Sequence, residues 1–345
     1  MKFRFMSASY EGKVLVFRLG MPPLSHSGFG SRFLLYSWFA AGSFLPSVVL
    51  GRGRIHWVFS QRVFATYPAI LVRFLFRRTV ISDETDIWPE AVVNTGLMAP
   101  GSLVFRLGRA ATKVACLASS RVTTMTERMR AFLAANYGVN PKTVTLIPYG
   151  GRRLDTNAFP TPGKFRVLYY GNLGPAYDFG VVLKAASELR DDEVSFVIRA
   201  DGDGMDTLKK QKDQLGLANL TFIQQPLGDK ELASLVSDSS ALLLPVKKQA
   251  FPDVSFAGKL IEYIQSGRPT ILVGEGYPAE LVAKYQVGLV LAPGDYKGLA
   301  DAITKLKGDT TLLNFLSANA RRVGAEEFGE SVIKDSLLQL FVAVE

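Results

Sequence analysis

The stretch FRVLYYGNLGPAYDFGVVLKAASELRDDEVSFVIRADGDG (165–204) contains the pattern that decides the fold. Its apolar runs at 165–170 and 194–200 have the length and residue types of buried strands, and residues 179–189 between them have helical periodicity. A strand, a helix and a second strand in this order are typical of parallel neighbours in one sheet. Glycine-containing segments follow both strands, at 171–174 and 202–204.

The same alternation continues on both sides of this stretch. Downstream we expect strands at 220–224, 241–244 and 270–273, and helices at 206–215, 230–236, 257–266, 278–286, 296–308, 312–328 and 331–344. Upstream we expect strands at 54–60, 79–83, 121–125 and 143–148, and helices at 64–77, 101–116 and 127–137. Glycines and polar residues at 150–162 mark a boundary. The sequence therefore predicts an α/β chain with an N-terminal domain (1–155), a doubly wound nucleotide-binding domain (156–328) and a C-terminal helix (329–345) that packs back on the N-terminal domain.

Composition excludes several classes of protein. With 345 residues, 48% of them hydrophobic, the chain has material for two cores. A single cysteine, Cys116, excludes a disulfide framework and a thiolate-rich metal cluster, and His26 and His56 are too far apart for a helical ligand pair. We therefore expect a cytoplasmic protein without a metal.

The charge of the chain is unevenly distributed. Residues 1–150 hold 18 lysines and arginines against 6 aspartates and glutamates, a formal +12, whereas the remainder carries −3. A basic half could meet nucleic acid, an anionic membrane or a phosphorylated substrate, or could be a solvated face, and charge alone does not choose among them.

One apolar run raises the question of a membrane. Residues 33–51, FLLYSWFAAGSFLPSVVLG, carry no charge and are flanked by Arg32 and Arg52. The run is nearly long enough to span a bilayer, but serines, glycines and Pro46 dilute it. A transmembrane span, a helix in the lipid interface and an ordinary buried helix all remain open.

Two observations indicate the ligand of the second domain: the nucleotide-binding motifs that the domain lacks, and the residues of one helix. Gly202 and Gly204 are followed by Thr207 where a dinucleotide fingerprint needs glycine, and no Walker A sequence occurs, which disfavours dehydrogenases and P-loop enzymes. In the helix at 257–266, Lys259 and the helix start could face an anion, and Glu262 could accept hydrogen bonds from a diol. An anion followed by a diol describes a nucleoside diphosphate; the alternative is an amphipathic helix with a solvated Lys–Glu pair.

Several motifs together resemble a known family. They are Tyr170-Gly171-Asn172-Leu173-Gly174, Asp201-Gly202-Asp203-Gly204, Gly258-Lys259-Leu260-Ile261-Glu262-Tyr263, Ser266-Gly267-Arg268-Pro269 and, in the first half, Asp86-Ile87-Trp88-Pro89-Glu90. The first four are similar to the donor domain of family 4 glycosyltransferases of the GT-B fold. The last resembles the D-L-W-P-E signature of a branch that includes fucosaminyltransferases and other transferases of surface-polysaccharide assembly. The resemblance implies two Rossmann-like domains facing across a cleft.

The resemblance also implies roles for individual residues. Glu262 matches the second glutamate of an E-x7-E motif that holds the donor ribose, and Lys259 matches the basic residue beside the diphosphate. Asp86 matches a position near the transferred sugar. Lys259, Glu262 and Asp86 are therefore the candidate catalytic residues. The donor-binding set comprises Gly171, Asn172, Gly174, Asp203, Gly204, Asp253, Ser255, Gly258, Lys259, Leu260 and Glu262, with Ser255 as the expected helix cap.

The chain departs from the family pattern in three places. Val254 stands eight residues before Glu262, where the first glutamate belongs, with Asp253 as an adjacent substitute. The basic residues that follow the first donor-domain strand are absent, which leaves Lys259, with Lys247 or Lys248, to neutralise the diphosphate. Residues 11–23 resemble a segment that follows the first βα unit of the family, so we expect a shortened N-terminal domain.

The implied activity is transfer of a sugar from a nucleoside diphosphate sugar to a hydroxyl, with retention at the anomeric carbon and no cofactor or metal. The implied acceptor is a glycan or a polyprenyl-diphosphate-linked sugar in polysaccharide synthesis, reached from the inner face of the plasma membrane. Three alternatives stay open: a nucleotide-sugar epimerase, a catalytically impaired remnant that only binds the nucleotide sugar, and a nucleic-acid binder.

Overall fold

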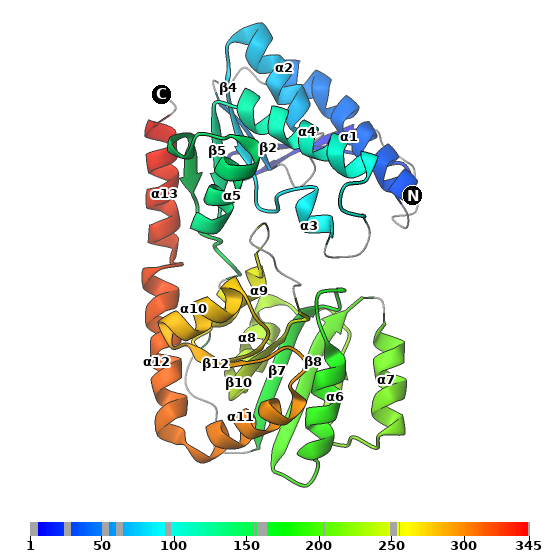
Figure 1. Cartoon of the computed structure of the whole chain (residues 1–345), viewed down its shortest axis with the longest axis vertical. Coiled ribbons are helices and arrows are strands. Elements are labelled where there is room, and N and C mark those ends of the chain that lie inside the picture. Colours follow the sequence, from blue (N-terminus) through cyan, green and yellow to red (C-terminus); the bar gives the residue numbers. More distant parts are fainter. Residues whose placement is uncertain are drawn as a thin grey trace. The chain divides into compact units, whose positions relative to one another are not determined.

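The computed structural model describes residues 6–23, 29–49, 55–59, 65–93, 98–152, 154, 156, 164–202, 204–248, 254 and 256–343. The chain divides into two compact units (Figure 1). The first comprises Met1–Val93, Met98–Ile147 and Gln339–Glu345, and the second Asn94–Leu97 and Pro148–Leu338.

The second unit is a doubly wound α/β domain. Its six-stranded sheet is parallel throughout and has the order β12-β11-β10-β7-β8-β9. The strands are β7 (Phe165–Asn172), β8 (Val194–Asp201), β9 (Leu220–Ile223), β10 (Ala241–Pro245), β11 (Thr270–Val273) and β12 (Gly288–Leu291). The helices are α6 (Phe179–Glu188), α7 (Met205–Gln214), α8 (Asp229–Ser237), α9 (Gly258–Gln265), α10 (Tyr277–Tyr285), α11 (Tyr296–Gly308), α12 (Thr310–Glu326) and α13 (Glu330–Val342). The strand order reverses between β7 and β10, and such a switch point is where open α/β sheets bind ligands.

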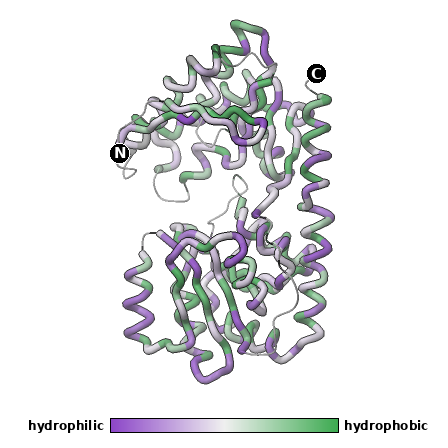
Figure 2. Tube along the Cα trace, turned by 180° about the vertical axis from the view of Figure 1, so that it is seen from behind, coloured by the Kyte–Doolittle hydropathy of each residue, from purple (hydrophilic) through white to green (hydrophobic). Residues whose placement is uncertain are grey.

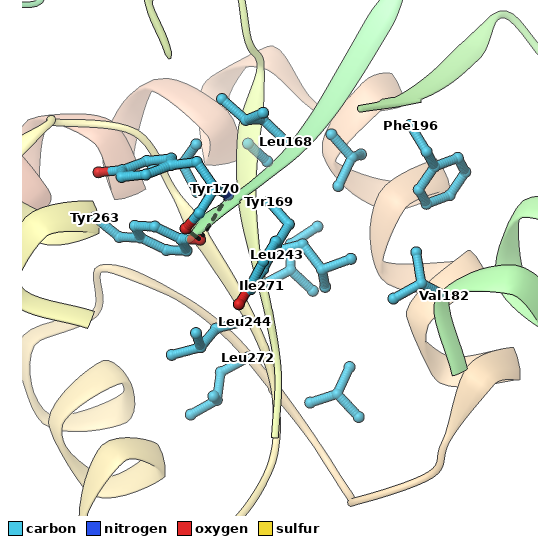
Figure 3. Close-up of a cluster of buried hydrophobic side chains, with 14 of the residues drawn as sticks. Leu168, Tyr169, Tyr170, Val182, Phe196, Leu243, Leu244, Tyr263, Ile271 and Leu272 are labelled. Atoms are coloured by element: carbon cyan, nitrogen blue, oxygen red, sulfur yellow. Dashed lines mark hydrogen bonds between the residues drawn. The ribbon is translucent and has the colours of Figure 1, made fainter. Parts of the chain in front are cut away.

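The central strands of this sheet are apolar on both faces because helices cover both. Leu168 and Tyr169 of β7 and Leu243 and Leu244 of β10 are each at most 1% exposed, and Figure 3 shows them packed beside Ile271 and Leu272 of the neighbouring strand. Burial on both faces is what near-continuous hydrophobic runs predict in a parallel sheet. This core fixes the ends of β7 and β10, where the candidate site lies.

The first unit has a smaller parallel sheet of four strands in sequence order, β3-β4-β5-β6. Its elements are β3 (Ile55–Phe59), α2 (Thr66–Phe76), β4 (Thr79–Asp83), α3 (Glu90–Val93), α4 (Leu103–Ala118), β5 (Arg121–Thr124), α5 (Glu127–Tyr137) and β6 (Val144–Leu146). Before them come an antiparallel hairpin, β1 (Met6–Glu11) with β2 (Val14–Leu19), and helix α1 (Phe29–Val49). The end of α13 also belongs here, since Arg121 donates a hydrogen bond to the Ala343 carbonyl (2.9 Å).

The predicted apolar run falls largely within α1. This helix has 21 residues and contains Pro46. Among the described residues, no helix combines the length and apolar character that a membrane crossing requires. The alternative of a transmembrane helix at 33–51 is therefore not supported by the described part of the run.

Two strand regions depart from the sequence prediction. The hairpin β1–β2 was not expected, and all six residues of β1 are exposed, so no burial pattern identifies it. Strand β12 was also missed between two expected helices. It begins with Gly288, where a Cβ atom would lie 2.7 Å from the carbonyl carbon of Thr270, so the close approach of β11 requires a residue that strand propensity disfavours.

Candidate functional site

The candidate site lies at the carboxyl ends of β7 and β10, on either side of the switch point. Two loops leave these ends and are tied together by backbone hydrogen bonds, from Asp178 N to Pro245 O (2.8 Å) and from Lys247 N to Ala176 O (2.9 Å). Tyr177 and Val246 also form an isolated bridge between the loops. The loop after β7 and the segment that leads to α9 therefore form one surface.

Gly171 and Lys259 meet at the centre of this surface. Gly171 is the next-to-last residue of β7 and has φ +147°; a Cβ atom built on it would lie 2.8 Å from Cδ and 3.1 Å from Nζ of Lys259, and closer still to Cε. The lysine chain thus crosses the strand end in space that only glycine leaves open. Its Nζ donates a hydrogen bond to Tyr177 Oη (3.1 Å) and lies 4.7 Å from the centre of that ring.

Helix α9 is held against β7 by Tyr263. The Tyr263 hydroxyl donates to the Tyr170 carbonyl (3.0 Å) and accepts from the Tyr170 N–H (3.1 Å), and the two rings are 4.8 Å apart (Figure 3). The register of β7 with β10 ends at Leu168 and Leu242. Beyond that point the Tyr263 hydroxyl forms hydrogen bonds with the N–H and the carbonyl of Tyr170. These bonds fix the start of α9, with Lys259, at the strand end.

The start of α9 is free of a side-chain cap. Ala257 is the N-cap and has no side-chain acceptor. The N–H groups of Gly258 and Leu260 donate to the carbonyls of Phe256 (3.0 Å) and Ala257 (2.8 Å), and the helix start keeps its positive dipole end. A Cβ atom on Gly258 would lie 3.2 Å from two atoms of the Tyr149 ring, so this tyrosine lies directly over the helix start. Ser255, the expected cap, lies outside the described residues.

Lys259 and Glu262 form a partly buried pair of opposite charge. Burial lowers the pKa of Lys259, and the Glu262 carboxylate acts against that shift. Burial raises the pKa of Glu262, while the charges of Lys259 and Arg152 and a hydrogen bond from the Arg152 backbone N–H lower it. Each side chain therefore favours the ionised form of the other. The two groups, one helical turn apart, present an ammonium and a carboxylate from the same helix.

Residues 149–152 complete the surroundings of Glu262. Gly151 has φ +56°, and a Cβ atom there would lie 3.2 Å from Cγ of Glu262. Arg152 also forms an ion pair with Asp229. Tyr149, Gly151, Arg152, Tyr177 and Tyr263 were not predicted from the sequence as parts of the site.

The second glycine segment supports the loop after β7. Gly202 has φ +136°, and a Cβ atom there would lie 3.1 Å from the Leu173 carbonyl oxygen. Leu173 N donates to Asp201 O (2.9 Å), and the Tyr169 hydroxyl donates to Asn172 O (2.7 Å).

The other predicted donor residues have different places in the structure. Gly174 closes a short turn with its N–H on Asn172 O (3.0 Å), and Gly204 starts α7 with φ +98°. Leu260 is fully buried in the core, so it anchors α9 and does not face a ligand. Asp203 and Asp253 lie outside the described residues.

Two sequence positions near the site have structural roles. Val254, at the place of the first glutamate, is 3% exposed and therefore offers no polar group to a ligand. Arg268 of the Ser266–Pro269 motif is also buried, and its guanidinium donates to the carbonyls of Val236 (3.2 Å) and Ser237 (2.7 Å) at the end of α8. It caps that helix by a side chain.

In the first unit, the D-I-W-P-E segment follows β4, and its residues have different roles. Asp86 is partly buried, and burial raises its pKa to about 6. Trp88 packs against α4, since a Cβ atom on Gly108 would lie 2.7 Å from Cη2 of its ring. Glu90 pairs with Arg109 (2.9 Å) and accepts a hydrogen bond from Tyr137 (2.5 Å). Trp88 and Glu90 hold the segment in place, and Asp86 is the carboxylate of the segment whose pKa burial raises.

Comparison with known proteins adds three findings. Residues 154–323 match the family model of glycosyl transferases group 1. The chain is 24% identical over 185 residues to the 2-deoxystreptamine N-acetyl-D-glucosaminyltransferase of Niallia circulans, covering 53% of this chain and 46% of that protein. It is 25% identical over 202 residues to the glycogen synthase of Mycobacterium tuberculosis, covering 57% and 46%. The chain thus spans about half the length of these curated relatives.

Solved structures share the fold over most of the chain. Sucrose-phosphate synthase from Thermosynechococcus elongatus matches with a TM-score of 0.77 and 17% identity, over 97% of this chain and 84% of that one. Anabaena HepE in complex with UDP matches with a TM-score of 0.66 and 16% identity, over 88% and 82%. The fold is therefore GT-B, an α/β fold with two parallel Rossmann-like sheets.

Proposed function

We propose that this chain, whose residues 154–323 belong to the glycosyl transferases group 1 family, transfers a sugar from a nucleoside diphosphate sugar to a hydroxyl group. The observation that carries the proposal is the position of Lys259 across Gly171 at the switch point, with Glu262 one turn further along α9. A cation at a strand end and at a helix start is a site for a diphosphate, and a carboxylate beside it is a site for ribose hydroxyls.

Lys259 has the central part in this mechanism. The bond between the anomeric carbon and the diphosphate oxygen breaks with its electron pair on the diphosphate. The acceptor hydroxyl oxygen bonds to the same carbon, and its proton passes to the departing diphosphate. The growing negative charge lies beside the Lys259 ammonium and the positive dipole end of α9. A diphosphate at this place favours the charged form of Lys259 and so offsets the burial that lowers its pKa.

Glu262 supplies orientation in the proposed complex. Its carboxylate accepts hydrogen bonds from the ribose hydroxyls, and the Arg152 backbone N–H holds that carboxylate in place. The Tyr149 ring over Gly258 is available to contact the nucleoside. Anabaena HepE carries UDP in its solved complex, and we propose UDP as the nucleotide to test first.

The acceptor side is assigned to the first unit. We propose a glycan or polyprenyl-diphosphate-linked hydroxyl as acceptor, since residues 1–150 carry a formal +12 and the D-I-W-P-E segment resembles that of polysaccharide transferases. Asp86, with a pKa of about 6, is the proposed contact to the transferred sugar. Asp86→Asn is expected to lower kcat more than it changes KM for the donor; equal kcat for both proteins would remove Asp86 from the mechanism.

The proposal is tested by calorimetric titration with UDP and GDP. One of them is expected to bind, and Lys259→Ala and Glu262→Ala are each expected to weaken it tenfold or more, a loss above about 1.4 kcal/mol. Lys284→Ala is the matched control, because Lys284 Nζ lies 4.7 Å from the ring centre of Tyr285, the same distance as Lys259 Nζ from the ring centre of Tyr177. Absence of binding by a folded chain, or equal losses in all three variants, would contradict the donor site.

A binding protein without turnover is the second candidate, favoured by one observation. Val254 is buried and apolar where the family pattern has a glutamate, so recognition of the donor sugar lacks that carboxylate. Release of UDP from UDP-glucose or UDP-N-acetylglucosamine separates the two candidates. Release that Lys259→Ala abolishes supports the enzyme; tight binding of UDP with no release in the presence of glycan and polyprenyl acceptors supports the binding protein.

A further inference from the structure

Helices α2 and α4 of the first unit lie side by side and share a face of the sheet. The Tyr67 hydroxyl of α2 donates to the Ala111 carbonyl of α4 (3.1 Å), and Ile70 packs against Ala115. Both helices belong to crossovers between neighbouring strands in the order β3-β4-β5. Because such crossovers are right-handed, the two helices cover the same side of the sheet.

The exposed sides of these helices are apolar, which is the reverse of an ordinary surface helix. In α4 the buried residues are small, Gly108, Thr112, Ala115 and Cys116. The large apolar residues point outward instead. We call the following six residues the α2–α4 surface: Leu71 (44% exposed), Phe74 (69%), Leu75 (60%), Leu107 (61%), Val114 (52%) and Leu117 (52%). A face of this kind marks an interaction site in a soluble domain.

The spacing shows that the α2–α4 surface is continuous along each helix. Leu107, Val114 and Leu117 are seven and three residues apart, so they form one row on α4, and Leu71, Phe74 and Leu75 form another on α2. The contacts Tyr67–Ala111 and Ile70–Ala115 place Leu71 close to the level of Leu117, so the two rows overlap there. Figure 2 shows the Cα trace from the side opposite to that of Figure 1, with hydrophobic residues in green.

The charge around this surface has one sign. Residues 12–82 and 91–126 contain no aspartate or glutamate. Arg106 and Lys113 are exposed, and being seven residues apart they form a row beside Leu107 and Val114; Arg77 is exposed at the end of α2. The ion pairs that the structure describes in this unit, Arg18–Glu11, Arg109–Glu90 and Arg130–Glu127, involve none of these three.

We propose that the α2–α4 surface docks on the anionic face of a lipid bilayer. The apolar rows enter the boundary between headgroups and acyl chains, and Arg77, Arg106 and Lys113 contact the lipid phosphates. A protein partner would need acidic groups placed around an apolar groove, whereas a bilayer surface supplies both features over the whole area of the two helices. This inference goes beyond the proposed function and does not rest on it.

The test is co-sedimentation of the full chain with vesicles. The chain is expected to sediment with vesicles of equal parts phosphatidylglycerol and phosphatidylcholine, and far less with phosphatidylcholine alone or at 1 M salt, where screening acts within about 3 Å. Arg106→Gln with Lys113→Gln is expected to lower the partition coefficient about 25-fold, because each basic residue near an anionic surface contributes about fivefold, or about 1 kcal/mol. Leu107→Gln with Leu117→Gln is expected to lower it at least tenfold.

Control variants keep the proposal falsifiable. Leu215→Gln and Phe315→Ser remove exposed apolar side chains of the second unit (42% and 48% exposed) and are expected to leave sedimentation unchanged. Circular dichroism checks that each variant is folded, and UDP titration of the same variants shows whether the donor site is affected. No sedimentation of the folded wild type would overturn the proposal. A second result would also overturn it: no vesicle binding, together with light scattering that finds a dimer which Leu107→Gln dissociates. The occupant of the α2–α4 surface would then be a second copy of the chain.

Discussion

Substitution of Gly171 by alanine probes the contact on which the donor site depends. The new Cβ atom would lie 2.8 Å from Cδ of Lys259 and 3.1 Å from its Nζ, so the lysine chain must move away from the strand end. The φ of +147° is also unfavourable for alanine, and the strain costs about 1 to 3 kcal/mol of stability. A displaced ammonium loses its charge-assisted hydrogen bond to the diphosphate, about 1.5 to 3 kcal/mol.

Gly171→Ala is therefore expected to weaken UDP binding roughly tenfold to 100-fold. The matched control is Gly216→Ala, which also places alanine at a positive φ (+62°) but where a Cβ atom would meet nothing within 4 Å. Calorimetry gives the affinities and urea unfolding gives the stabilities.

A double-mutant cycle with Lys259→Ala decides whether the two residues act together. If Gly171→Ala weakens binding through the lysine, it should have little further effect on affinity in the Lys259→Ala background. Full additivity of the two losses, or unchanged affinity in a folded Gly171→Ala protein, would refute the reasoning.

The remaining predictions concern stability and pH. Tyr263→Phe removes both hydrogen bonds to the Tyr170 backbone (3.0 and 3.1 Å) and should cost about 2 to 4 kcal/mol in urea unfolding; a cost below 0.5 kcal/mol would show that the hydroxyl does not hold α9. Asp86 has a folded pKa of about 6, above its unfolded value near 3.9, so the folded state holds the extra proton and stability should fall as pH rises from about 4 to 6. Asp86→Asn should remove its own part of that fall and leave the part due to Asp83, whose pKa burial also raises to about 6. The variant should be more stable than the wild type by about 2 to 3 kcal/mol above pH 6, with equal stability below pH 4; a parallel pH profile in both proteins would contradict it. In Gly108→Ala the new Cβ atom would lie 2.7 Å from Cη2 of Trp88 and should displace the ring. The variant should therefore show altered tryptophan fluorescence and lose about 1 to 3 kcal/mol of stability. An unaltered spectrum with unaltered stability would argue against this packing.

Most of the fold could be predicted from local patterns of apolar and polar residues in the sequence. The strands of the second unit are apolar on both faces, and their helices are amphipathic, so order and type were predictable to within a few residues. Strand β12 was not predicted because it is four residues long and starts with Gly288. This glycine is required by the close contact with β11, although glycine has a low strand propensity. The hairpin β1–β2 escaped because β1 is exposed throughout.

The candidate site could be predicted only in part, for a related reason. Lys259 and Glu262 are three residues apart on one helix, so helical geometry alone places them together. Tyr263 holds that helix through Tyr170, 93 residues away, and Tyr149 and Arg152 come from the start of the second unit, before β7. Such contacts are made by the tertiary fold, and no spacing of residues in the sequence predicts them.

A crystal structure of the chain with UDP is the most direct test of the central claim. The account predicts the diphosphate at the carboxyl end of β7, with an oxygen about 3 Å from Lys259 Nζ, and the ribose hydroxyls on the Glu262 carboxylate. UDP bound elsewhere, or bound here with Lys259 still on Tyr177 and Glu262 away from the ribose, would contradict it.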